Sequence, residues 1–72
     1  MEVIIKLDKL LKEKNMSQRE FAKITGIRHP TISAMCNNTA QQIPIKNIKS
    51  ICKVLEIDDL NELITIEKDS QN

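Results

Sequence analysis

Apolar residues along this chain recur mainly at spacings of three and four, the period of an amphipathic α-helix. Leu7, Leu10 and Leu11 would share one face of a first helix, which Asn15 can end because asparagine tolerates a left-handed backbone. A longer helix is predicted to begin at Pro44. Its apolar face would contain Ile45, Ile48, Ile51, Cys52 and Leu55. The pattern therefore predicts a helical protein.

A second helix is marked at both ends. Ser17 and Glu20 have the S-x-x-E spacing of a capping box, and Met16 and Phe21 occupy the two positions of a hydrophobic staple. Gly26, the only glycine in the chain, follows soon after and favours the positive φ that ends a helix. The second helix is therefore expected to be short and to end near residue 25.

A third helix is predicted directly after this glycine. Pro30 fits its first turn, where the missing N–H costs no hydrogen bond. A buried face with i, i+3, i+4 spacing would contain Ile32, Met35 and Cys36. An outward stripe would contain His29, Ser33 and Asn37, with Pro30 and Ala34 beside it. Two short helices joined by a glycine turn, the second of them amphipathic, are typical of a helix-turn-helix.

The ends of the chain allow more than one structure. Asp58 can cap a fifth helix over "DDLNELI", which would return Leu60, Leu63 and Ile64 to the core. Residues 3–5 and 64–67 can pair as a two-stranded ribbon, or the residues after 64 can fray. We expect one domain over residues 1–66 and a flexible tail over residues 67–72.

Composition narrows the class of protein. A chain of 72 residues has room for one domain. Because 40% of the residues are hydrophobic and only 1% are aromatic, we expect a core of Ile, Leu, Val and Met rather than a roomy cofactor cavity. The chain lacks a signal-peptide pattern and an apolar run of roughly 20 residues that could span a bilayer. We therefore expect a cytoplasmic protein.

The formal net charge of +1 hides an uneven distribution. Residues 1–53 contain ten basic and four acidic residues, a net charge of +6, whereas the last 19 residues contain one basic and six acidic residues, a net charge of −5. A basic body with an acidic end suits an anionic partner that meets one face. Alternatively, the charged residues cluster by chance on a solvated surface and have no partner.

Few side chains suggest covalent or metal chemistry. Cys36 and Cys52 have no C-x-x-C partner and both occupy apolar helical positions, which indicates reduced core thiols. His29 has no Asp, Glu or Cys at matching helical spacing, so it is more simply an exposed residue than a metal ligand or catalytic base. Glycine-rich phosphate loops and nucleophile elbows are absent. We expect no enzyme activity, no cofactor and no bound metal.

The segment "SQREFAKITGIRHPTISAMCNN" resembles the helix-turn-helix of the phage-repressor/Cro (XRE-like) transcriptional regulators, and the resemblance extends over roughly residues 6–64. It rests on the small Ala22 at the helix crossing, the turn glycine, Ile27 and the "TIS" of residues 31–33. Arg28 stands where the family often has a capping serine, Thr25 where an apolar residue is usual, and Asn38 where a glycine is common. The resemblance implies an all-α, lambda-repressor-like fold of five short helices, with a possible ribbon joining the two ends.

The resemblance also implies a DNA-binding surface. In this family the third helix, here residues 29–37, enters the major groove. Residues implied to face base edges are His29, Pro30, Thr31, Ser33 and Ala34. Gln18, Asn37 and Lys46 would contact phosphates, while Arg28 could contact a phosphate, read a base or cap the helix.

These residues lead to a functional hypothesis and an alternative. The hypothesis is a sequence-specific regulator that binds double-stranded DNA, a small repressor of phage or bacterial type that could form a homodimer. The alternative is a protein-interaction module on the same fold, which binds a repressor or another regulatory protein. Its motive is the modest net charge together with the acidic C-terminal segment.

Overall fold

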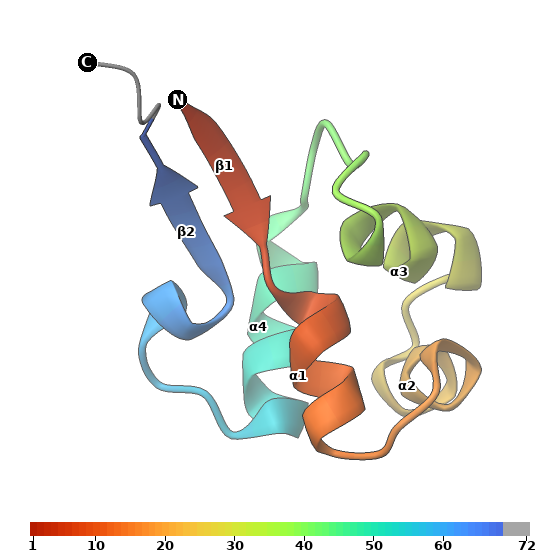
Figure 1. Cartoon of the computed structure of the whole chain (residues 1–72). Helices are drawn as coiled ribbons and strands as arrows, with labels where there is room; N and C mark the ends of the chain where they lie inside the picture. The colour runs from red at the N-terminus through yellow and green to blue at the C-terminus, as the bar shows by residue number, and fades with distance from the viewer. Residues whose placement is uncertain (69–72) are drawn as a thin grey trace.

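The computed structural model describes residues 1–68, which form four α-helices, one short 3-10 helix and a two-stranded antiparallel sheet (Figure 1). In chain order the elements are β1 (Glu2–Ile5), α1 (Leu7–Glu13), α2 (Gln18–Thr25), α3 (His29–Cys36), α4 (Ile45–Leu55), η1 (Leu60–Glu62) and β2 (Ile64–Glu67). The predicted helical class is confirmed, and the two ends of the chain meet in the sheet.

The core is built from aliphatic side chains around a single ring. Phe21 is fully buried, and the described residues include no buried polar or charged side chain. The core contains Ile5, Leu7, Leu11, Phe21, Ile27, Ile32, Met35, Cys36, Ile51, Leu55, Ile57 and Leu63. The four α-helices and β1 contribute to it, and Ile64 of β2 packs against it, so the helices and the sheet share one core.

Local signals set the ends of the first two helices as predicted. Asn15 has a φ of 54° just beyond α1. At the start of α2, the Ser17 Oγ accepts a hydrogen bond from the Glu20 N–H at 3.0 Å, and the Glu20 Oε1 accepts one from the Ser17 N–H at 3.3 Å. Gly26 ends α2 with a φ of 78°. The capping box and the glycine turn are thus confirmed.

The predicted ribbon is also confirmed. β1 and β2 are antiparallel, and Val3 pairs with Ile66 while Ile5 pairs with Ile64. All four side chains lie on one face of the ribbon because strand side chains alternate between faces. Ile5 is buried, whereas Val3 and Ile66 are 61% and 60% exposed, because this end of the ribbon extends past the helices (Figure 1).

The prediction of a fifth helix is wrong. The only helix within residues 58–64 is the three-residue η1, capped by Asp59, whose Oδ1 accepts a hydrogen bond from the Asn61 N–H at 3.0 Å. The Lys6 N–H donates to the Leu63 carbonyl at 2.6 Å, and the chain is extended from Ile64 onward. Pairing with β1 therefore leaves too few residues for an α-helix.

Two residues predicted to face the core do not do so. Leu60 is 51% exposed because η1 is too short to turn it inward. Ile45 is 71% exposed at the first position of α4, where Pro44 serves as the N-cap. The remaining positions of the predicted α4 face are buried or partly buried.

Part of the predicted tail over 67–72 lies outside the described residues, namely residues 69–72. Glu67 is the last residue of β2, opposite Glu2. Within residues 1–68, no helix has the length and apolar character that crossing a membrane requires.

Candidate nucleic-acid interface

The turn between α2 and α3 is fixed by backbone and hydroxyl hydrogen bonds. The Gly26 N–H donates to the Ala22 carbonyl at 2.9 Å. The Thr25 Oγ1 donates to the Phe21 carbonyl at 2.8 Å and accepts from the Ile27 N–H at 3.2 Å. A Cβ on Gly26 would meet no atom within 4 Å, so the glycine is required for its positive φ and not for space. The two hydrogen bonds of the Thr25 hydroxyl explain why a threonine occupies a position where the family usually has an apolar residue.

One face of α3 is held in the core. Ile32 and Met35 are fully buried and Cys36 is 9% exposed, as their spacing predicts. His29 and Asn37, on the predicted outward stripe, are exposed, and Ser33 between them is half-buried. The helix therefore presents a surface of small and polar residues to solvent.

The side chains predicted to bind DNA are all accessible to some degree. Those that are exposed are Arg28, His29, Pro30, Asn37 and Lys46, and those that are half-buried are Gln18, Thr31, Ser33 and Ala34. Within residues 1–68, no side-chain hydrogen bond or ion pair engages any of these nine residues. Their polar groups are therefore available to an external partner.

The structure narrows the three roles considered for Arg28. Arg28 is the N-cap residue of α3 by its backbone, with φ −63° and ψ 142°, but its side chain forms no capping hydrogen bond. Its carbonyl instead accepts the Thr31 and Ile32 N–H groups at 3.0 and 3.1 Å. The guanidinium is exposed beside the start of α3, where it could meet a phosphate or a base.

The starts of the helices differ in electrostatic character. The first turns of α3 and α4 contain no acidic residue and have no side-chain cap, whereas those of α1 and α2 contain Asp8 and Glu20. Free N–H groups and the helix dipole favour an anion at an uncapped helix start. Lys46, in the first turn of α4, adds a positive charge. Gln18 is less favourably placed for a phosphate, because the Ser17 hydroxyl already caps its helix and the Glu20 carboxylate lies in the same turn.

The uneven charge along the sequence is also uneven in space. α2 and α3 lie on the side of the molecule opposite β2 and η1 (Figure 1). The acidic residues of the C-terminal segment that the structure describes are Glu56, Asp58, Asp59, Glu62 and Glu67, all of them exposed. They lie after α4, in and around η1 and β2, whereas α3 itself contains no acidic residue.

The cysteines show no sign of a reactive site. Burial, followed by the nearby Asp8 carboxylate, raises the pKa of the Cys36 thiol to about 11, while Lys12 acts in the opposite direction. Cys52 is partly buried against the core, and neither cysteine is in a disulfide. In the part of the chain that the structure describes, no three His, Cys, Asp or Glu residues are grouped to hold a metal ion.

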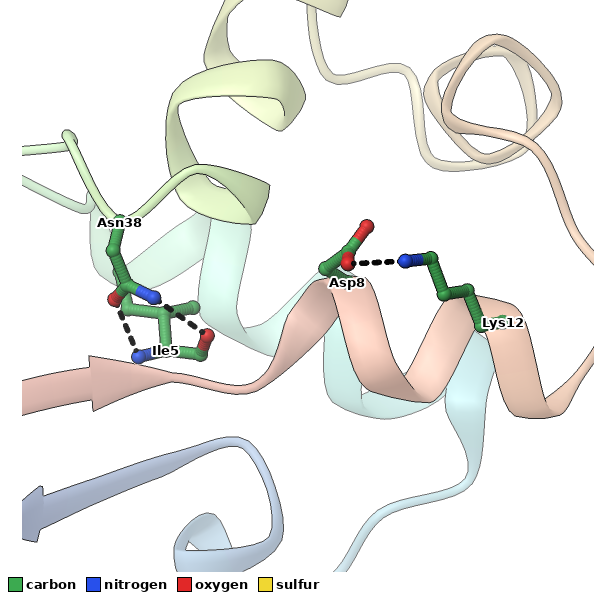
Figure 2. A network of polar contacts seen from close by, with 4 residues as sticks. All are labelled: Ile5, Asp8, Lys12 and Asn38. Carbon is green, nitrogen blue, oxygen red and sulfur yellow. Dashed lines mark hydrogen bonds and ion pairs between the residues drawn. The ribbon is translucent and has the colours of Figure 1, made fainter.

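A contact that the sequence did not reveal involves Asn38. The Asn38 Oδ1 accepts a hydrogen bond from the Ile5 N–H at 2.8 Å, and its Nδ2 donates to the Ile5 carbonyl at 3.4 Å (Figure 2). Asn38 was visible in the sequence only as a departure from a usual glycine. Its partner lies 33 positions away, and no local pattern signals that pairing.

Comparison with protein families identifies a matching family. The model of the Cro/C1-type HTH DNA-binding domain matches residues 6–69, a range that includes all four helices and the turn between α2 and α3. Neither the curated proteins nor the solved structures provide a match.

Proposed function

The chain belongs to the Cro/C1-type HTH DNA-binding domain family, and from this membership we propose that it is a sequence-specific transcriptional regulator that reads double-stranded DNA with α3. The observation that carries the proposal is the division of α3 into two faces. Ile32 and Met35 are fully buried, while the opposite face offers side chains with no partner among the described residues. A DNA-binding family also fits the expectation that the chain is not an enzyme.

The outer face of α3 offers groups suited to base edges. His29 could bond to the N7 or O6 of guanine, and the hydroxyls of Thr31 and Ser33 can donate to or accept from several bases. Pro30 and Ala34 could contact the methyl group of thymine. The major groove, about 12 Å wide, admits a helix with side chains as small as these.

Phosphate contacts would come from the edges of this surface. Arg28 precedes α3, Asn37 follows it, and Lys46 lies in the uncapped first turn of α4. Gln18 lies at the start of α2. Such contacts set the register of a protein on DNA without reading sequence. Arg28 could also reach a base, since its side chain does not cap the helix.

We further propose repression as the mode of action, in the cytoplasm of a bacterium or of a phage-infected cell. A small domain that occupies a promoter can block other proteins without a ligand-sensing module. A homodimer would read two half-sites about 34 Å apart. Selection from random duplex DNA would supply the operator for the assays below, and an enriched palindrome would support the homodimer.

Charge reversal at the interface tests the proposal. Arg28→Glu and Lys46→Glu should each weaken operator binding by about tenfold at low salt and lower the slope of log affinity against log salt by about 1. The matched control is Lys68→Glu, which makes the same charge change just after β2, the strand on the side opposite α2 and α3 (Figure 1). It should leave the slope unchanged.

The competing hypothesis is a module that binds a regulatory protein instead of DNA. Absence of DNA binding at low salt, or binding that does not weaken as salt rises, would contradict the proposal and favour this alternative. An equal effect of all three charge reversals would indicate a general charge effect and would contradict the assigned surface.

A further inference from the structure

The end of α3 has an unusual residue at a demanding position. The Asn38 N–H donates to the Met35 carbonyl at 3.3 Å and the Thr39 N–H donates to the Ala34 carbonyl at 2.9 Å, the two bonds of a Schellman motif. Asn38 has a φ of 59°, a conformation that glycine adopts most readily. Asparagine is tolerated here but is not the residue that the backbone alone would favour.

The Asn38 side chain offsets this disadvantage through β1. Its amide binds both the N–H and the carbonyl of Ile5, as a neighbouring strand would (Figure 2). β2 occupies the other edge of β1, where the Lys6 N–H donates to the Leu63 carbonyl. Ile5 is 7% exposed, so its backbone groups need a partner within the protein. Asn38 therefore joins the end of α3 directly to the ribbon.

We propose that Asn38 is a positioning residue that sets the orientation of α3 for base recognition by tying the end of this helix to β1. This inference rests on the proposed function. Two-turn α3 is held along its length by Ile32 and Met35, which pack in the core and limit its position. A second attachment, beyond the last turn, limits its tilt.

Loss of the contact between Asn38 and β1 should reduce the specificity of DNA binding more than its affinity. Hydrogen bonds to base edges need donor and acceptor atoms within about 2.7–3.2 Å, so a small tilt of the reading helix breaks them. Attraction to phosphates depends on charge over longer distances and tolerates such a tilt. Loss of the Asn38 tie should therefore reduce discrimination between operator and random DNA.

A matched pair of variants isolates the effect of the hydrogen bonds between Asn38 and Ile5. Asn38→Gly keeps the left-handed backbone and removes the side chain that binds Ile5. Asn15→Gly makes the same change at another left-handed asparagine, φ 54°, whose exposed side chain forms no hydrogen bond within residues 1–68. Both glycines suit their backbone, so the pair differs mainly in the contact with β1.

Three measurements apply to both variants at a temperature where each is folded. In Asn38→Gly, hydrogen exchange of the Ile5 amide should accelerate. Residual dipolar couplings should show α3 reoriented relative to α1 and α4. The ratio of operator affinity to random-DNA affinity should fall about tenfold, the value of one modest base contact, with the salt slope unchanged. Asn15→Gly should match the wild type in all three.

The outcomes separate this inference from the proposed function. Faster exchange at Ile5 with unchanged couplings and an unchanged affinity ratio would show that Asn38 only stabilises the fold, which overturns the inference. Loss of affinity that is equal on operator and random DNA would overturn it as well. If the wild type selects no operator, both the proposed function and the proposed role in base recognition are contradicted. The residual dipolar couplings would still show whether Asn38 sets the orientation of α3.

Discussion

Burial alters the chemistry of the Cys36 thiol. Its position between α3 and α1 removes it from water and places it near the Asp8 carboxylate, and both effects favour the neutral thiol. Its pKa is therefore raised from the ordinary 9.0 to about 11. Near neutral pH the thiol is protonated, so Cys36 acts as an apolar core residue.

The raised pKa predicts how stability depends on pH. Between about pH 9 and pH 11 the folded protein holds the Cys36 proton more firmly than the unfolded chain. The corresponding stability is complete below pH 9 and is lost as the pH rises towards 11. Urea unfolding at pH 8 and pH 10.5 should show a larger decrease for the wild type than for Cys36→Ala, by on the order of 1 kcal/mol. Equal decreases would contradict the assigned shift, since the lysines titrate in both proteins.

Residues whose roles depend on neighbours in sequence could be predicted. Ser17, Gly26 and Ile32 follow from a cap motif, a backbone preference and a helical period, and the structure confirms all three. Thr25 and Asn38 could be seen only as departures from a family pattern. The role of Thr25 depends on a turn geometry, and that of Asn38 on a strand 33 positions away.

Among the elements, α2 depends most clearly on its cap. It has eight residues, and the Ser17 hydroxyl binds one of its free N–H groups. Ser17→Ala should lower the free energy of unfolding by about 1 kcal/mol, and the melting temperature by about 4–8 °C. Ser50→Ala is the matched control, because Ser50 lies inside α4 and forms no hydrogen bond of its side chain within residues 1–68. Thermal melts with equal shifts would contradict the role of the cap.

The last two elements show where local patterns fail. Asp58 and the leucines of residues 58–64 fit a helix, yet the segment forms η1 and then β2. The β-branched run at residues 64–66 pairs with β1, and long-range pairing outweighs a local preference. The helix-turn-helix was easier to predict than this end, because α2, the turn and α3 each carry signals within a few residues.

At the scale of the whole molecule, the acidic residues in and around η1 and β2 lie on the side opposite α3 (Figure 1). The protein measures 43 × 23 × 23 Å, which exceeds the screening length of about 8 Å at physiological ionic strength. If DNA binds at α3, as proposed, counterions should therefore screen it from the acidic residues around η1 and β2 at this ionic strength. At low ionic strength the screening length grows to about 30 Å, and these charges should repel DNA.

This argument predicts a salt-dependent effect of the acidic end. The triple variant Asp58→Asn, Glu62→Gln and Glu67→Gln raises the formal net charge by three and spares Asp59, which caps η1. Association with DNA should be faster than for the wild type at about 10 mM salt and equal to it at about 0.15 M, because added counterions screen the distant charges. Stopped-flow association rates at the two salt concentrations measure this difference. A gain that persists at 0.15 M would place the acidic residues at the DNA-binding face and would contradict the orientation with α3 toward the groove.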